Sequence, residues 1–227
     1  MQYMGGKKRI GARIAEVLKR YREDGQTYIE PFIGVGSVIR HMDGIRQGSD
    51  INLDLILLLK GLRDGTFIPP MELSEAKHKQ LKHSTSSPLR AFAGFGCSFG
   101  GKWFRGYARN GIRNYALGAY NELLKLQPYL VGIDLSCKSY DNLAPYGDLV
   151  YCDPPYRATS KFACGSFDHE KFWYTMRMWS ENNTVIISEY TAPKDFECIA
   201  TYPVKSTLSS GSITANVVEE KLWTKKQ

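Results

Sequence analysis

Cysteine, histidine and long apolar runs are scarce in this sequence of 227 residues. The five cysteines are an odd number and include no Cys-x-x-Cys pair, which argues against both a disulfide framework and a zinc site. The four histidines form no ligand set, so we expect metal-free chemistry. No apolar run reaches the ~18 residues that a membrane span requires, and the first residues lack the apolar core of a signal peptide. We therefore expect a soluble cytoplasmic protein without a membrane partner.

Acidic residues are missing from residues 76–121, a segment that holds eight basic residues. That segment has a charge of +8 and the whole chain +7, so the remainder has a charge of −1. A positive block in a nearly neutral protein is typical of proteins that bind the phosphate backbone of nucleic acids. A solvated basic face is the alternative. The eight residues are Lys77, Lys79, Lys82, Arg90, Lys102, Arg105, Arg109 and Arg113.

The rest of the composition is that of a globular protein, with 43% hydrophobic and 23% charged residues. The length suits one domain, or one domain with a modest insertion. In the first part of the chain, apolar periodicity and turn residues predict a βαβ pattern, which is typical of an open α/β sheet. The expected elements are a helix at 8–22, a strand at 27–29, a helix that starts at 37, a strand at 46–50 and a helix at 53–62.

The alternation breaks between residues 65 and 114, where proline pairs, serine clusters and glycines predict an insertion rich in loops and helices. After the insertion the alternation resumes. We expect a helix at 115–126, a strand at 133–135, a strand at 148–152, a helix at 169–179 and a strand at 185–188. Two late segments, 200–208 and 217–223, are expected to pair as a closing antiparallel hairpin across 209–211.

A glycine-rich turn follows the first expected strand and reads Glu30-Pro31-Phe32-Ile33-Gly34-Val35-Gly36. Glycines there let the backbone approach a ligand at the carboxyl end of the strand, where doubly wound sheets bind nucleotides. Asp50, at the end of the next strand, is the acid expected to bind ribose hydroxyls. The third glycine of a dinucleotide fingerprint is missing, which favours a nucleoside without phosphates, such as S-adenosylmethionine. A simple turn is the alternative.

The most informative motif is Asp153-Pro154-Pro155-Tyr156, which follows the expected buried strand at 148–152. Two prolines stiffen the turn and lack N–H donors, so the Pro154 carbonyl is presented on a rigid backbone. Asp153 and this carbonyl can accept the two N–H bonds of an exocyclic amine, while Tyr156 stacks on the base. The alternative is a turn that ends a strand and carries a surface tyrosine.

Together these motifs resemble the Dam-like, alpha-group adenine-N6 DNA methyltransferases (the D12 class). Further likeness, to short phage and prophage members, comes from residues 98–104, 167–173 and 187–193. The resemblance covers nearly the whole chain. The four ordered motifs are Tyr3-Met4-Gly5-Gly6-Lys7, Glu30-Pro31-Phe32-Ile33-Gly34-Val35-Gly36, Ser49-Asp50-Ile51-Asn52 and Tyr151-Cys152-Asp153-Pro154-Pro155-Tyr156.

The resemblance implies an α/β, Rossmann-like S-adenosylmethionine-dependent methyltransferase sheet with a C-terminal antiparallel hairpin. Residues 1–64 and 115–227 would form the catalytic domain, and residues 65–114 an inserted target recognition region. Asp153 would also meet the cofactor's amino end, and Lys7 can pair with its methionine carboxylate. Where the family often has an acid before an aromatic residue, this chain has Ser139-Tyr140, so only ring stacking by Tyr140 is expected there. The expected cofactor-binding residues are Tyr3, Gly6, Lys7, Glu30, Pro31, Phe32, Gly34, Gly36, Asp50, Tyr140 and Asp153.

The expected function is site-specific methylation of adenine N6 in double-stranded DNA by base flipping, with S-adenosylmethionine as the methyl donor. A cytosine-N4 DNA methyltransferase, an rRNA guanine-N2 methyltransferase and a catalytically silent DNA-binding regulator are the alternatives. A phage or restriction-modification context and a monomeric state are further expectations. The expected DNA-binding residues are Lys102, Trp103, Arg105, Tyr107, Arg109 and Arg113, although some aromatic rings are expected to form the core of the insertion instead.

Overall fold

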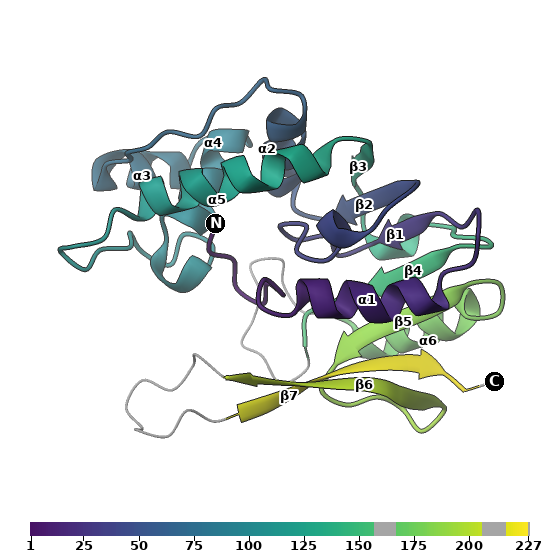
Figure 1. Ribbon diagram of the computed structural model, residues 1–227. Helices are drawn as coiled ribbons and strands as arrows, with labels where there is room; N and C mark the ends of the chain where they lie inside the picture. The colour runs from purple at the N-terminus through teal and green to yellow at the C-terminus, as the bar shows by residue number, and fades with distance from the viewer. Residues whose placement is uncertain (157–166, 206–216, 227) are drawn as a thin grey trace.

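The computed structural model describes residues 1–156, 167–205 and 217–226 (Figure 1). Its described strands form one seven-stranded sheet in the order β3-β2-β1-β4-β5-β7-β6. β1 to β5 run parallel, whereas β7 is antiparallel to both β5 and β6. The strands are β1 (Tyr28–Glu30), β2 (Arg46–Asp50), β3 (Ile133–Cys137), β4 (Leu149–Cys152), β5 (Thr184–Glu189), β6 (Phe196–Lys205) and β7 (Val217–Lys225).

Except for the first, at Gly11–Tyr21, the described α-helices begin at a residue whose side chain caps them. Asn52, Asn114 and Asp168 each accept a hydrogen bond from a backbone N–H of the first turn that follows. The α-helices are α1 (Gly11–Tyr21), α2 (Leu53–Arg63), α3 (Glu75–Lys82), α4 (Pro88–Ala91), α5 (Tyr115–Leu130) and α6 (His169–Trp179). Shorter turns of helix are η1 (Ile39–His41), η2 (Phe92–Gly96), η3 (Phe99–Gly101) and η4 (Tyr140–Asn142).

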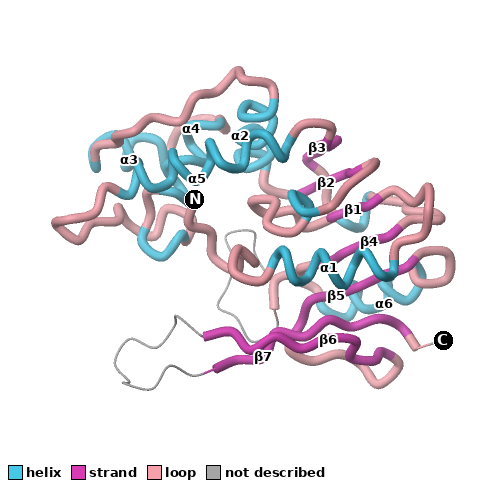
Figure 2. Tube along the Cα trace, viewed as in Figure 1, coloured by secondary structure: helices cyan, strands magenta, loops and turns pink. Residues whose placement is uncertain are grey.

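Helices cover both faces of the sheet, and the side chains of β4 show how. Leu149 and Tyr151 join a core cluster with α1, α2 and α5, while Val150 and Cys152 join a second cluster with α6. Successive side chains of a strand point to opposite faces, so this alternation assigns one cluster to each face. Figures 1 and 2 show α1 in front of the sheet and α6 behind it. The α/β, Rossmann-like sheet and the C-terminal antiparallel hairpin are therefore confirmed.

The expected insertion packs onto the catalytic part instead of forming a separate core. Phe92, Ala93 and Cys97 are fully buried and belong to the same cluster as α1, α2 and α5. Gly94 allows this packing, because an added Cβ would lie 2.4 Å from the Trp103 ring. The division into a catalytic domain and a recognition region at 65–114 remains a prediction.

One expected helix is much shorter than predicted. The helix expected to start at residue 37 is a single turn, Ile39–His41. Met42 already has an extended backbone, and Gly44 turns the chain into β2 with a φ of 67°. The chain thus reaches the next strand before a longer helix can form. The turn of the expected closing hairpin, 209–211, lies outside the described residues.

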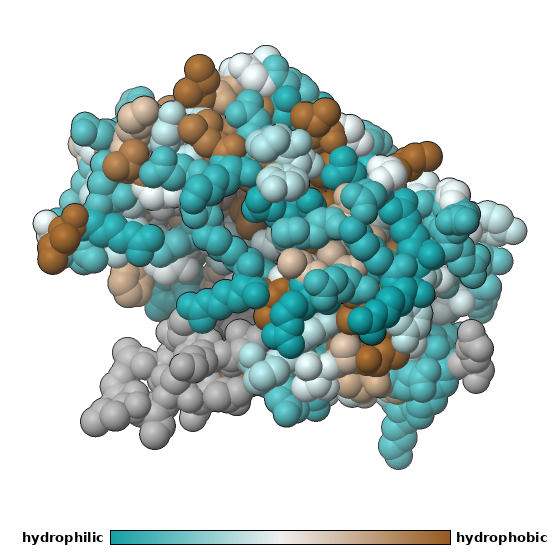
Figure 3. Space-filling view, in the orientation of Figure 1, coloured by the Kyte–Doolittle hydropathy of each residue, from teal (hydrophilic) through white to brown (hydrophobic). Residues whose placement is uncertain are grey.

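The surface in view is mostly hydrophilic, with hydrophobic side chains in small separate spots (Figure 3). Within the part of the chain that the structure describes, no helix is both long enough and apolar enough to cross a membrane.

Candidate active site

A cleft of about 1790 Å³ opens where β1, β2 and β4 end. Open α/β sheets bind their ligands at the carboxyl ends of the strands. One small ligand fills roughly 300–1,000 Å³, so this cleft has room for two. The N-terminal segment from Tyr3 to Lys7 contributes to its lining, and so do residues of the insertion and of β7. Sequence motifs that are far apart along the chain therefore meet in one place.

Lys7 and Asp153 form an ion pair in this cleft. The Lys7 ammonium nitrogen lies 2.7 Å from Asp153 Oδ1 and 3.3 Å from the Gly5 carbonyl, and the lysine is only 7% exposed. Burial alone would lower the pKa of Lys7, but the carboxylates of Asp153 and Glu220 raise it above its ordinary value. Lys7 is therefore a permanent cation that holds Asp153 in place.

Tyr156 is buried rather than displayed on the surface. The residue is only 8% exposed. The Lys7 ammonium nitrogen lies 4.7 Å from the centroid of its ring, and the Tyr190 ring makes a T-shaped contact with it at 4.8 Å between centroids. The Tyr156 hydroxyl donates a hydrogen bond to Glu220 Oε1. The alternative of a turn with a surface tyrosine is therefore wrong.

Glu220 is a site residue that the motifs did not reveal. It lies on β7, is 6% exposed, and its carboxylate is 3.7 Å from the Lys7 ammonium. Burial raises its pKa, Lys7 lowers it, and Asp153 raises it, with a net rise. A signal was present in the sequence. Glu220 is two residues before the fully buried Leu222 in a strand, so it occupies a core-facing position, where an unpaired acid is costly.

The glycine-rich turn and Asp50 meet as expected. The backbone N–H of Gly34 donates to Asp50 Oδ2 at 3.1 Å, and that of Asn52 donates to Asp50 Oδ1 at 2.9 Å. Gly34 has a φ of 51°, and an added Cβ would lie 3.2 Å from the Tyr3 ring. Burial raises the pKa of Asp50, and the backbone hydrogen bonds oppose that rise. The turn thus fixes a carboxylate at the cleft wall, close to an aromatic ring.

Glu30 ends β1 and is almost completely buried at 3% exposure. The Tyr28 hydroxyl donates to Glu30 Oε1 at 2.5 Å. Burial raises the pKa of Glu30 to about 8, although the hydrogen bond from Tyr28 opposes that rise. Glu30 is therefore mostly protonated at neutral pH.

Replacing Glu30 by glutamine is expected to make the protein's stability less sensitive to alkaline pH. The folded-state pKa of Glu30 lies above its unfolded value, so the stability it contributes is complete below about pH 4.5 and is lost as the pH rises through about 8. Glutamine imitates the protonated form. The unfolding free energy of Glu30→Gln minus that of the wild type should thus increase by a few kcal/mol between about pH 5 and pH 9. Urea denaturation across this range measures it. Glu16→Gln, at an exposed position of α1, is the control, and an unchanging difference for Glu30→Gln would contradict the prediction.

An aromatic cluster forms another wall of the cleft. The Phe32 ring lies 5.3 Å from the Tyr140 ring and 5.9 Å from the Phe167 ring, and all three residues line the cleft. Beside them, Lys171 binds the Asp141 carboxylate at 2.5 Å. Tyr140 therefore lies where ring stacking against a bound ligand is feasible, while the neighbouring acid is already paired.

The four basic residues expected to bind DNA divide into two groups. Lys102, Arg105 and Arg113 line the cleft. Arg109 forms an ion pair with Glu75 at 3.2 Å, on the surface. Three basic side chains of the insertion therefore face the site that also holds Asp153.

The two expected aromatic DNA contacts are packed within the insertion. The Trp103 ring lies 4.7 Å from the Phe95 ring and 5.1 Å from the Arg90 guanidinium. The Tyr107 hydroxyl donates to the Leu73 carbonyl at 2.6 Å. For these rings the structure favours the packing role.

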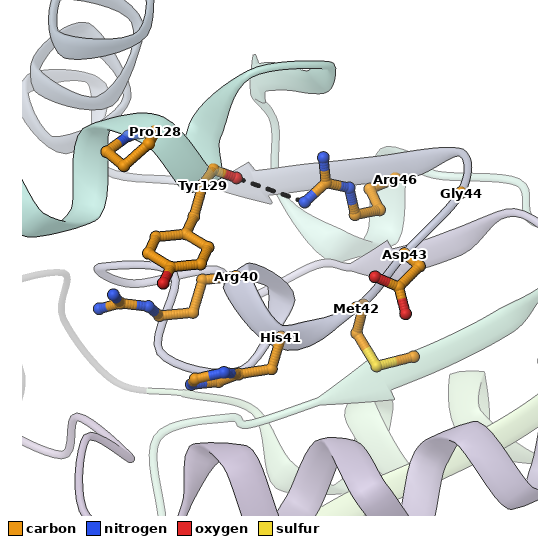
Figure 4. Close-up of a pocket in the computed structure, with 8 residues that line it drawn as sticks. All are labelled: Arg40, His41, Met42, Asp43, Gly44, Arg46, Pro128 and Tyr129. Carbon is orange, nitrogen blue, oxygen red and sulfur yellow. Dashed lines mark hydrogen bonds between the residues drawn. The ribbon is translucent and has the colours of Figure 1, made fainter.

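A second, smaller pocket of about 500 Å³ lies beside Arg40, Arg46 and Tyr129 (Figure 4). Arg46 donates to the carbonyls of Tyr129 and Val131 at 3.3 and 2.7 Å, and Arg40 stacks on the Tyr129 ring at 4.6 Å. These carbonyls lie at the C-terminal end of α5, where cationic side chains stabilise unpaired helix carbonyls. Arg46 thus joins α5 to β2, and Arg40 joins α5 to η1.

Among the described residues, no group of three or more histidine, cysteine, aspartate or glutamate side chains could hold a metal ion. The site therefore consists of a lysine, carboxylates, backbone amides and aromatic rings. Such a set suits a cationic or nucleoside-like organic ligand.

Known proteins are similar to this chain in sequence. Residues 3–87 match the family of D12 class N6 adenine-specific DNA methyltransferases. The chain is 28% identical to the DNA adenine methylase of Escherichia coli K12 over 194 residues, which are 72% of this chain and 66% of that protein. The corresponding enzymes of Salmonella typhi and Vibrio cholerae are 27% and 26% identical, with the same coverage. The chain thus spans just under two thirds of the length of these relatives.

Among solved structures, an rRNA methylase from Streptococcus thermophilus aligns with 97% of this chain and 98% of its own, at 10% identity and a TM-score of 0.43.

Proposed function

We propose that this chain transfers a methyl group from S-adenosylmethionine to the N6 amine of adenine in double-stranded DNA. Its matches support its assignment to the Dam-like adenine-N6 DNA methyltransferases. One observation carries the proposal. Asp153-Pro154-Pro155-Tyr156 lies at the end of β4, in a cleft that also contains Lys7, Asp50 and three basic side chains of the insertion.

The donor set fits S-adenosylmethionine. Asp50 would accept the ribose hydroxyls with the lone pairs that Gly34 and Asn52 leave available, since each carboxylate oxygen can accept more than one hydrogen bond. Gly34 lets the ligand approach the backbone, and Phe32 and Tyr140 offer ring faces for the adenine. Lys7 has three N–H donors, so it can keep Asp153 and direct another donor to the methionine carboxylate. When bound, this cofactor supplies a methyl group activated by a positive sulfur.

The chain's own residues would then position the target amine. The N6 lone pair of adenine is delocalised into the ring, so the amine is a poor nucleophile. Asp153 and the Pro154 carbonyl would accept its two N–H bonds and draw the nitrogen toward a tetrahedral shape. Lys7 keeps Asp153 aligned through the 2.7 Å ion pair. Transfer then depends mainly on orientation and electrostatics rather than on a covalent enzyme intermediate.

The target base must leave the DNA double helix before it can reach Asp153, at a cost of a few kcal/mol. Stacking on Tyr156 would offset part of that cost. Lys102, Arg105 and Arg113 line the cleft and would bind the phosphates on either side of the flipped nucleotide.

Removing Arg105 and Arg113 together is expected to reduce the salt dependence of DNA binding. Each lost phosphate contact should lower the slope of log K against log salt by roughly 0.9, so the double alanine variant should lose close to twice that. Fluorescence anisotropy with a labelled duplex at several salt concentrations measures the slope. Arg20→Ala is the control, since Arg20 is exposed in the last turn of α1 and outside the cleft lining. An unchanged slope in the double variant would place the DNA elsewhere.

Nucleoside analysis tests the proposed function directly. The protein is incubated with labelled S-adenosylmethionine and either duplex DNA or ribosomal RNA, and the products are digested and separated. We expect label in N6-methyladenine from DNA. Label in N4-methylcytosine or in N2-methylguanine would favour one of the two other methyltransferases. DNA binding without transfer would favour a silent regulator.

A further inference from the structure

A buried acid on the C-terminal hairpin enters the active site from a strand that contains none of the recognised motifs. Glu220 and Leu222 lie on the same side of β7, and Leu222 is fully buried in the cluster beside α1. Glu219, the preceding residue, points to the other side, and its side chain is 61% exposed. β7 thus extends the core toward the cleft and places a carboxylate in the cleft lining.

The carboxylate of Glu220 has a specific partner. The Tyr156 hydroxyl donates to Glu220 Oε1, whereas the Lys7 ammonium lies 3.7 Å from the same oxygen. Lys7 itself is closer to Asp153, at 2.7 Å. The main contact of Glu220 is therefore with the tyrosine, and its contact with the lysine is weaker.

Within the described part of the chain, three contacts restrain Tyr156. The Lys7 ammonium lies 4.7 Å from its ring centroid, the Tyr190 ring meets it at 4.8 Å, and Glu220 binds its hydroxyl. The contacts with Lys7 and Tyr190 limit the movement of the Tyr156 ring at its face and edge. The ring can still tilt without losing either contact. A hydrogen bond at the far end of the side chain removes that tilt, because it fixes the position of the oxygen.

We propose that Glu220 is a positioning residue that fixes the ring of Tyr156 for stacking against the flipped adenine, an inference that rests on the proposed function. It acts through the tyrosine hydroxyl and does not touch the substrate. Its effect is on orientation, and small misplacements of positioning groups cost large factors in rate.

A double-mutant cycle between Glu220 and Tyr156 tests the proposal. Glu220→Ala should lower kcat roughly 10- to 100-fold, the factor expected for a hydrogen bond to a charged group. The KM for S-adenosylmethionine should change little. Glu220→Gln keeps an acceptor oxygen and should stay within roughly threefold of the wild type. In a Tyr156→Phe background, which has no hydroxyl to hold, Glu220→Ala should add less than roughly threefold.

Two further measurements keep the cycle decisive. Glu219→Ala is the matched control on the same strand and should retain wild-type activity. A duplex with 2-aminopurine at the target adenine reports how the flipped base stacks, and its fluorescence should be altered by Glu220→Ala but not by Glu220→Gln. Glutamine and phenylalanine are close in shape to the residues they replace, so these variants carry the test even if Glu220→Ala does not fold.

The outcomes separate this inference from the proposed function. Two results overturn the inference. One is an equal loss of kcat from Glu220→Ala in the wild-type and Tyr156→Phe backgrounds. The other is a Glu220→Gln variant whose kcat is as low as that of Glu220→Ala. If Glu220→Ala does not fold, wild-type activity and fluorescence in Glu220→Gln support the inference, and a loss of either overturns it. A wild-type protein that methylates no DNA adenine in the same assay overturns the proposed function, and the inference with it.

Discussion

Asp153→Ala is expected to abolish methyl transfer while DNA binding remains largely intact. Alanine removes the acceptor that meets the target amine, and it also removes the partner of the Lys7 ammonium. Removing one preorganised electrostatic group from an active site costs roughly 10²- to 10³-fold in rate, and here the same residue also aligns the cofactor's amino end. The expected loss is therefore at or beyond the upper end of that range.

Single-turnover methylation with excess enzyme measures the loss, and anisotropy with the same duplex measures binding. Asp153→Asn belongs in the same experiment because it keeps the shape and replaces one acceptor oxygen by a donor; it should be nearly as inactive as alanine. Asp148→Asn, just before β4 at its opposite end, is the control and should remain active. Near wild-type turnover by Asp153→Ala would contradict the proposed role of Asp153 in methyl transfer.

Lys7→Met is expected to produce the second largest effect, on stability as well as on activity. The change keeps the length of the side chain but leaves the carboxyl groups of Asp153 and Glu220 without their shared cation. Breaking a buried ion pair by removing one partner costs about 3–5 kcal/mol. Binding of S-adenosylmethionine should weaken in parallel, since its carboxylate would lose its cationic partner.

The pH dependence identifies the cause of that loss. Burial already raises the pKa of Glu220 and Lys7 opposes that rise. Without Lys7 the folded-state pKa of Glu220 should rise further above its unfolded value, so stability is retained at low pH and lost as the pH increases. The gap between wild type and Lys7→Met should accordingly be small near pH 5 and large near pH 8, as measured by urea denaturation. Lys8→Met is the matched control. Lys8 is 64% exposed and pairs with Glu122, so its loss should cost at most about 1 kcal/mol at either pH. Equal costs for the two lysines would contradict the prediction.

The strands were predictable because their periodicity is local. Leu149–Cys152 and the Val185–Ile187 centre of β5 are continuous apolar runs, which parallel strands buried on both faces require. The meeting of Asp50 and Asp153 was likewise predictable, since parallel strands end at the same edge and bring the residues there together. Lys7 precedes every described strand, so its place in the site was expected only from the family resemblance. The order of the seven strands and the position of β7 between β5 and β6 depend on tertiary packing, which no local pattern reports.

The insertion contains local signals for two helix starts. Its serine and proline clusters indicated loops, yet Ser87 accepts a hydrogen bond from the backbone of Arg90 and Pro88 occupies the first turn of α4. Serine before proline is the ordinary start of a helix, since proline has no N–H to leave unpaired there. Ser74 caps α3 in the same way. Glu220 was missed for another reason, because its partners Lys7 and Tyr156 are remote in sequence and its role follows only from their meeting.

The position of β7 has a consequence for the order in which the site is assembled during synthesis. β7 lies between β5 and β6 although it follows both in the chain, and it brings Glu220 to Lys7, which precedes all the described strands. Until β7 is made, the edge of β5 that β7 covers is unpaired and the Glu220 carboxylate is not yet present beside Tyr156. The nascent chain can therefore assemble its first five strands but not a complete site. The cleft should therefore acquire its Glu220 carboxylate only after β7 has entered the sheet.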